Sequence, residues 1–367
     1  MTADFYGRSM SYVVEVSILI FCLGAAIAYI VAVGDILEEG VLNVFDHPSY
    51  VTRDFLIVIF FTFVMLPLSL FERVDSLRFS SLFGLLSIFF LVLSIMVHSI
   101  RYMSTTGFEL SWEQSGVVLF PASALDFFRA CPLIIFAFSC HVNVPQIFSE
   151  LVPRSVGRMN VTTRCGVGVC NTSYLLIGVF GYLNFGKHTS DNVLKNYCVS
   201  KETDYMIVAA FICITIAITM AYPLCILPSR VTIEIMLMRF RNDKNYLAKQ
   251  QLGDDDEDLV EPLLEDDNDY PEISTNRRVL LTIAIAGFSL FVALVIPDVS
   301  IIFGLTGGSA VGLVSFIMPG LFMLKAAPER RNVMAWAMII GGTVISLLGT
   351  SVTVYDIFND EQVQKIC

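Results

Sequence analysis

The stretch FAFSCHVNVPQIFSEL, from Phe136 to Leu151, lies inside a long apolar run but places Cys140, His141, Asn143 and Pro145 at its centre. Polar side chains and unpaired backbone groups are costly in the hydrocarbon of a membrane, so they face a bundle interior or a water-filled cavity. Proline lacks an amide N–H and disfavours helical geometry in the residue before it. The stretch therefore predicts a membrane-spanning helix that is broken at Pro145.

Two interpretations of this break stay open from the residues alone. Secondary transporters form binding sites at discontinuous helices, whose half-helix ends present free N–H and C=O groups to a zwitterion or an ion. A proline kink, with polar side chains hydrogen-bonded to a neighbouring helix, would have the same sequence. The residues favour the two interpretations equally.

The composition of the whole chain is that of a polytopic membrane protein. Of its 367 residues, 55% are hydrophobic and 16% are charged, with a mean hydropathy of +0.71. Soluble domains carry about 25% charged residues. The nine cysteines lie mostly within apolar runs and show no metal-binding spacing, so we expect no metal site.

A helix needs roughly 20 apolar residues to cross the hydrocarbon core of a bilayer. Nine stretches meet this condition, and we therefore expect an all-α protein with nine transmembrane helices. These stretches are Val13–Leu37, Phe55–Leu70, Leu77–His98, Phe127–Leu151, Thr162–Phe185, Tyr205–Leu227, Val279–Ile296, Ile301–Leu324 and Val333–Ile357.

Lys and Arg gather in alternate loops, which the positive-inside rule places in the cytoplasm together with the start of the chain. One of these loops, residues 242–276, contains the acidic run QLGDDDEDLVEPLLEDDNDY. High charge and the lack of apolar periodicity predict a disordered cytoplasmic loop there. Its part from 250 to 275 is a candidate for sorting or signalling partners, although a solvated linker is the simpler interpretation.

Further polar or small residues in the spans are candidates for a binding site, each with a structural alternative. Thr215 and Thr219 stand four residues apart on one helix face, and could contact an ion or bond only to their own helix carbonyls. Tyr29 could reach a substrate carboxylate or be a packed aromatic. The glycine-rich stretch FGLTGGSAVG, residues 303–312, predicts close helix packing or an irregular turn.

The sequence contains no GxSxG, HExxH or P-loop motif and no carboxylate pair in a plausible cleft. We therefore expect no enzymatic activity, no nucleic-acid partner and no cofactor.

Five motifs, in order along the chain, resemble those of the sodium-coupled neutral amino acid transporter family, within the amino acid/auxin permease family. FAFSCHVNVPQIFSEL is similar to the sixth helix of that family. The others are LPLSLFERVDSLRFSS from Leu66, GYLNFG from Gly181, YPLCILPSR from Tyr222 and IPDVSIIFGLTGGSA from Ile296. These motifs are distributed along nearly the whole chain.

The resemblance implies a leucine-transporter-type fold of eleven helices, built from two inverted repeats around broken helices one and six. If the opening helix here is the third of the family, the first two are missing. Residues 1–367 would then be one N-terminally incomplete transporter domain.

The resemblance also implies secondary active transport of neutral amino acids by alternating access, coupled to sodium or protons. It implies an amino acid substrate and a plasma-membrane or vacuolar/lysosomal location. Cys140, His141, Asn143 and Tyr29 would bind substrate, and Thr215 and Thr219 are candidate ion contacts. The alternatives are a transporter-like amino acid sensor and an inactive truncated product.

Overall fold

The structure, a computed structural model, describes residues 8–38, 52–71, 77–106, 116–118, 120–121, 123–190, 192–197, 204–251, 275–326 and 333–359. Every regular element in these ranges is helical. Nine of the described helices are long and apolar enough to cross a membrane, and each overlaps one of the nine predicted stretches. The prediction of an all-helical membrane protein is therefore confirmed.

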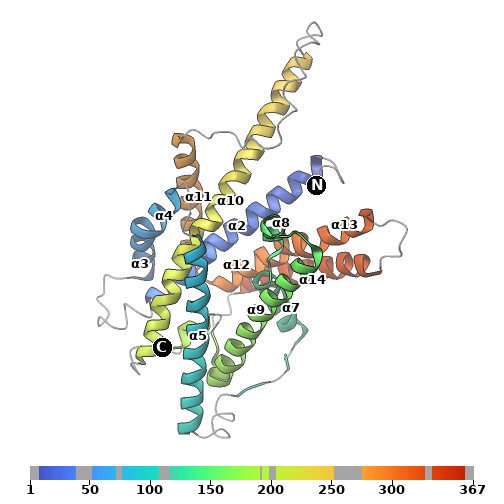
Figure 1. Cartoon of the computed structure of the whole chain (residues 1–367). Helices are drawn as coiled ribbons and strands as arrows, with labels where there is room; N and C mark the ends of the chain where they lie inside the picture. The colour runs from blue at the N-terminus through green and yellow to red at the C-terminus, as the bar shows by residue number, and fades with distance from the viewer. Residues whose placement is uncertain are drawn as a thin grey trace.

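Helix α2 (Arg8–Leu37) lies at the centre of the molecule. It packs against α10 (Tyr205–Gln251), α11 (Thr275–Val295) and α3 (Arg53–Phe60) (Figure 1). Alanines on α2, among them Ala26 with no exposed surface, allow these helices to approach closely. These four helices share one hydrophobic cluster, and we call them the four-helix unit.

The α3 helix continues through a π-helical segment, η2 (Phe61–Met65), into the short α4 (Leu66–Leu70). Pro67, the second residue after the π segment, has no N–H to donate to the turn before it. Inside the cluster the ring of Phe61 meets the ring of Tyr222 edge-on, with centroids 6.0 Å apart. The second predicted span is thus a single, irregular helix that belongs to the four-helix unit.

A second group of helices forms around the first half of the broken helix. Helix α7 (Ala124–Ala137) packs against α12 (Val299–Thr306), the π-helical segment η8 (Gly307–Val311) and α14 (Val333–Asn359). Another π-helical segment, η9 (Leu313–Ile317), and α13 (Met318–Ala326) complete the eighth span. The glycine-rich stretch therefore forms an irregular turn of helix.

The same stretch also packs closely, so both interpretations of its glycines hold. A Cβ atom on Gly307 would lie 2.2 Å from the carbonyl oxygen of Pro132 in α7. On α14, a Cβ on Gly349 would lie 2.3 Å from the ring of the same proline. Such distances are far inside van der Waals contact, so glycine is what permits α7 to lie against both neighbours.

Helix α5 (Leu77–Thr106) packs against both α10 and α9 (Val156–Phe185). Between α9 and α10 lie two short turns, η4 (Gly186–His188) and η5 (Val193–Asn196). Tyr197 follows η5 and its ring packs edge-on against that of Phe185. Burial raises the pKa of Tyr197 to about 12, so its phenol stays neutral in this loop.

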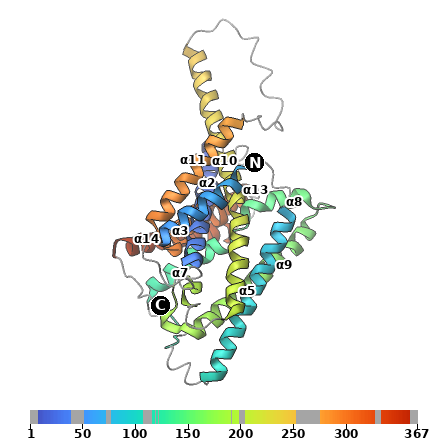
Figure 2. The ribbon, with the colours of Figure 1, turned by 90° about the vertical axis from the view of Figure 1, so that its left-hand side faces the viewer.

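Helix α10 is longer than the sequence predicts. Its span was expected to end at Leu227, but the helix passes through Pro223 and Pro228 and ends at Gln251. Both views show the end of α10 projecting beyond the other helices (Figures 1 and 2). The residues after Pro228 are mostly good helix formers, which explains the extension. The predicted disordered loop 242–276 is thus helical as far as residue 251, and residues 252–274 lie outside the described part of the chain.

A buried carboxylate ties the four-helix unit together at the end of α2. The Asp35 side chain has no exposed surface. Arg53 Nη2 donates to Asp35 Oδ1 at 2.9 Å, Lys195 Nζ lies 3.2 Å from the same oxygen, and Asn192 donates to Oδ2 at 3.1 Å. Arg53 also reaches the carbonyl oxygen of Pro297 at 3.4 Å. One carboxylate therefore joins α2, α3 and the loop that carries η5, and Arg53 connects them to the entrance of α12.

A second buried charge cluster joins the middle of α10 to the first turns of α11. Arg230 and Glu234 are 6% and 2% exposed. Arg230 Nη1 donates to the hydroxyl of Thr282 at 3.2 Å, and Arg277 Nε lies 3.3 Å from Glu234 Oε1. Arg230 lies within α10 and is a buried link between the two helices.

The carboxylate of Asp35 gives a first prediction. Asp35→Asn leaves Arg53 and Lys195 without their shared counter-ion, so we expect the free energy of unfolding to fall by about 3 kcal/mol. Chemical denaturation of the purified protein in detergent measures this loss. Asp54→Asn is the matched control, because Asp54 is 67% exposed and 4.0 Å from Arg53, and it should change stability by less than about 0.5 kcal/mol. Equal effects of the two substitutions would contradict the assigned role of Asp35.

Close packing at Gly307 gives a second prediction. Gly307→Ala forces a methyl group against the backbone of α7, which cannot move as a side chain can, and should destabilise the protein by about 2 kcal/mol. The control is Gly287→Ala in α11, where a Cβ meets nothing within 4 Å. Better helix propensity should make that control neutral or stabilising by up to about 1 kcal/mol. Thermal unfolding of both variants checks the contrast, and a stable Gly307→Ala variant would mean that α7 is not held closely here.

Candidate functional site

The predicted break in the fourth span is present, but it begins before the proline. Helix α7 ends at Ala137, a 3-10 turn, η3, covers His141–Asn143, and α8 covers Val144–Glu150. Pro145 lies in the first turn of α8, where a missing N–H needs no partner. Val144 keeps helical dihedrals, with φ −56° and ψ −46°, so the expected effect of proline on the preceding residue does not occur. The interruption falls on residues 138–140.

Backbone groups at the break find partners locally and from α9. The amide of Cys140 donates to the carbonyl of Phe138 at 3.0 Å, and the amide of Asn143 donates to the carbonyl of Cys140 at 3.1 Å. The hydroxyl of Tyr174 in α9 donates to the carbonyl of Ala137 at 3.0 Å. The sequence does not indicate a role for Tyr174, because its contact with Ala137 joins residues 37 positions apart and leaves no local pattern.

Three aromatic rings meet immediately before the break. The ring of Phe136 stacks on that of Phe303 in α12 at a centroid distance of 4.4 Å, with the planes 26° apart. On its other side, Phe136 meets Phe21 of α2 at 5.5 Å. The last turn of α7 is thus fixed between the four-helix unit and the eighth span.

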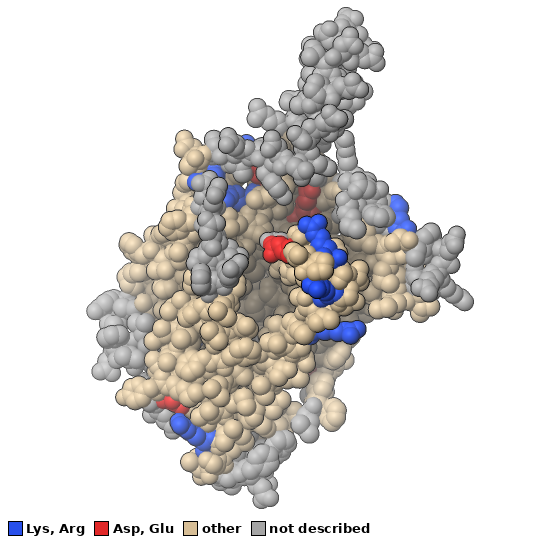
Figure 3. Space-filling view, viewed as in Figure 1, with Lys and Arg blue, Asp and Glu red and all other residues tan. Residues whose placement is uncertain are grey.

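The polar side chains of the break are exposed. Cys140, His141 and Asn143 each present a large part of their surface, and Cys140 is a free thiol. The space-filling view shows a hollow near the centre of this face, with basic and acidic side chains gathered along its edge (Figure 3). These three predicted site residues therefore lie together on one turn with exposed side chains.

Tyr29 lies on the α2 side of the same region. It is partly buried and packs against the hydrophobic cluster of the four-helix unit. It is also within electrostatic range of Tyr174, which donates its hydroxyl hydrogen to the end of α7. Tyr29 therefore lies toward the break, and its ring packs against the hydrophobic cluster.

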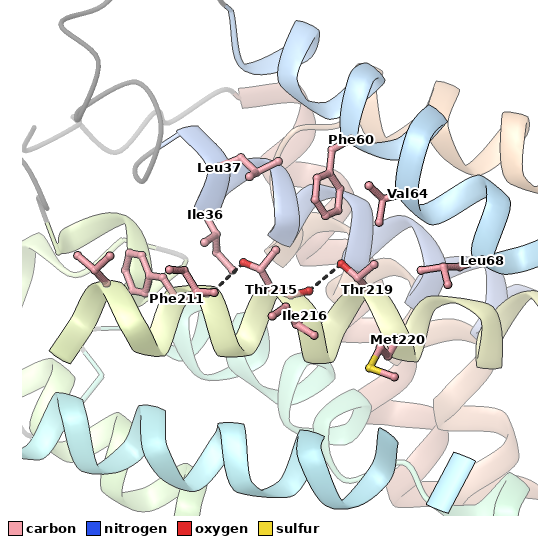
Figure 4. Close-up of a pocket in the computed structure, with 12 residues that line it drawn as sticks. Ile36, Leu37, Phe60, Val64, Leu68, Phe211, Thr215, Ile216, Thr219 and Met220 are labelled. Atoms are coloured by element: carbon pink, nitrogen blue, oxygen red, sulfur yellow. Dashed lines mark hydrogen bonds between the residues drawn. The ribbon is translucent and has the colours of Figure 1, made fainter. Parts of the chain in front are cut away.

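Thr215 and Thr219 lie elsewhere. The hydroxyl of Thr215 donates to the carbonyl of Phe211 at 2.8 Å, and that of Thr219 donates to the carbonyl of Thr215 at 2.7 Å (Figure 4). Both side chains line an apolar cavity of about 530 Å³ between α2, α3, η2, α4 and α10. None of its described lining residues belongs to the broken helix. The structure therefore does not join the candidate ion contacts to the candidate substrate contacts.

The chemistry of the break suits a small zwitterion. The end of an α-helix carries a partial negative charge on its last carbonyls, which attracts a cation. Beside the end of α7 stand a thiol, an imidazole and a carboxamide, with an aromatic ring stack one turn away. An ammonium group could approach the carbonyls, while the side-chain amide of Asn143 could donate to a carboxylate.

Comparison with known proteins places the chain in a family. Residues 1–358 match the model of the family described as transmembrane amino acid transporter protein. The chain is 25% identical to vacuolar amino acid transporter 5 of Schizosaccharomyces pombe over 360 residues, which cover 94% of the chain and 77% of that protein. It is equally 25% identical to sodium-coupled neutral amino acid transporter 7 of Danio rerio, covering 94% of the chain and 69% of that protein.

A family match over nearly the whole chain, together with nine candidate membrane spans in its described part, leads to one assignment. The chain belongs to the transmembrane amino acid transporter protein family, and is a membrane transporter and not an enzyme.

Proposed function

We propose that the protein moves neutral amino acids across its membrane by secondary active transport, with alternating access to the site at the broken helix. The observation that carries this proposal is the interruption at residues 138–140, where polar side chains are exposed at a helix end. Because this site offers no fully charged side chain of its own, it favours a substrate whose side chain is neutral.

Cys140, His141 and Asn143 are proposed to contact the substrate, and Tyr29 to close the site from the side of α2. Tyr174 supports the geometry, since its hydroxyl holds the Ala137 carbonyl at the end of α7. A discontinuous helix at a central site is typical of inverted-repeat transporters, and this feature supports a leucine-transporter-type arrangement for this chain.

The coupling ion is proposed to be sodium or a proton, as among proteins of this type. Thr215 and Thr219 are the candidate contacts, and the lone pairs of their oxygens stay available while the hydroxyl hydrogens bond to the helix. The names of the two relatives indicate a vacuolar and a sodium-coupled transporter respectively. We therefore propose a plasma-membrane or a vacuolar/lysosomal location.

Uptake measurements with a substituted break test the proposed function. Asn143→Leu removes a hydrogen-bonding group from the site while keeping the branching of the side chain, and should reduce neutral amino acid uptake about tenfold, since one polar contact contributes roughly 1–3 kcal/mol. The protein is expressed from its native gene, and uptake is divided by its abundance in the membrane. Asn160→Leu is the control, because Asn160 is an exposed residue of α9. If Asn143→Leu transports normally, the break is a packed kink and not a binding site.

Thiol labelling tests whether substrate occupies the same turn. A membrane-impermeant methanethiosulfonate should react with Cys140, an exposed free thiol, and inhibit uptake, whereas a Cys140→Ser variant should resist inhibition. Saturating neutral amino acid should slow the reaction, because a bound substrate would cover the turn. Mass spectrometry of the labelled peptide identifies the site. Reaction at Cys140 that is unaffected by every neutral amino acid would place the substrate elsewhere.

A further inference from the structure

Arg129 and Asp356 form the best-aligned ion pair among the described residues. Arg129 Nε donates to Asp356 Oδ2 and Arg129 Nη2 donates to Asp356 Oδ1, both at 2.7 Å. Two parallel N–H···O bonds of this kind fix the relative orientation of their groups, which a single contact does not. Arg129 lies in the second turn of α7 and Asp356 near the end of α14, so the pair connects two helices 227 residues apart in the chain.

The guanidinium is oriented from its own helix as well. Asp126 Oδ1 accepts from Arg129 Nη1 at 3.2 Å, and the other carboxylate oxygen of Asp126 closes the capping box with Ser123. The first turn of α7 therefore holds Arg129 in position for α14. Such pre-organisation lowers the side-chain entropy that an exposed ion pair otherwise loses.

Below this pair, α7 is in continuous close contact with α14 and η8. Pro132, three residues after Arg129, lies against Gly349 of α14 and Gly307 of η8, where any Cβ would collide. Phe136, four residues further on, stacks on Phe303. Because the Arg129 pair and the break are joined by one packed helix, a change at the pair is transmitted to the residues that follow Ala137.

We infer that Arg129 and Asp356 are positioning residues for transport: their bidentate pair fixes α7 against α14 and so sets the place of the substrate-binding turn at residues 138–143. This inference rests on the proposed function for its effect on transport, but not for its effect on the geometry of the break. Neither residue touches the substrate.

The experiment has two readouts on the protein expressed from its native gene. Asp356→Asn keeps the shape of the side chain but removes the charge, and should raise KM for neutral amino acids about tenfold while Vmax per molecule in the membrane changes less than about twofold. It should also change the rate at which a methanethiosulfonate labels Cys140, a measurement that needs no transport. Arg129→Lys keeps the charge but cannot form two parallel hydrogen bonds to the carboxylate. It should therefore lie between the wild type and Asp356→Asn in both readouts.

Exchange of the two charges separates positioning from general stability. The double variant Arg129→Asp with Asp356→Arg should return KM and the Cys140 labelling rate toward wild-type values, since the pair is re-formed in reverse. Arg101→Gln is the matched control, because Arg101 is paired with Asp204 at 4.0 Å and is 70% exposed, and both readouts should stay at wild-type values.

The outcomes are distinguishable. Unchanged KM and unchanged Cys140 labelling in Asp356→Asn would overturn the positioning role, as would a loss of abundance alone with normal KM in the remaining protein. A wild type without amino acid uptake would overturn the proposed function, but the labelling rates would still decide whether the pair positions the break.

Discussion

The constraint on which this structure depends is that backbone groups inside a membrane must find partners within the protein. Among the described residues, eight of the nine candidate spans meet it with helices that are continuous, apart from π-helical turns. The fourth span, Ala124–Asn143, is interrupted, and the carbonyl of Ala137 at the end of α7 accepts a hydrogen bond from the hydroxyl of Tyr174 in α9. Such a pairing needs α7 and α9 to be placed accurately relative to each other.

Charge is used in this protein mainly to fix helices at their ends. Asp35 and Glu234 are both buried, and each holds an arginine from a different helix of the four-helix unit. Removing charges from water is costly, and at Asp35 hydrogen bonds from Arg53 and Asn192 offset part of that cost. Together with the hydrophobic cluster between them, they make α2, α3, α10 and α11 one body with links at both ends. The broken helix touches this body through the ring of Phe21.

The sequence predicts the spans well because hydropathy is a local property. It also predicts that the fourth span is interrupted, since Cys140, His141 and Asn143 are costly in hydrocarbon. It misplaces the interruption because proline is tolerated in the first turn of a helix, so Pro145 begins α8 and does not end α7. Prolines also fail to mark the end of α10, which continues past Pro223 and Pro228 although both lie inside the helix. Contacts such as that of Asp35 with Asn192, 157 residues away, leave no local signal at all.

The separation of Thr215 and Thr219 from the break bears on how transport could be coupled. Two ligands that share one cavity influence each other by direct contact, but here the apolar cavity at the threonines and the turn at residues 138–143 share no described lining residue. A coupling free energy between separate sites requires an element with two arrangements that both ligands bias. Helix α2 lines the cavity with Ile36 and contacts the end of α7 through Phe21. It is therefore the element through which an ion near α10 could change the affinity of the break for an amino acid.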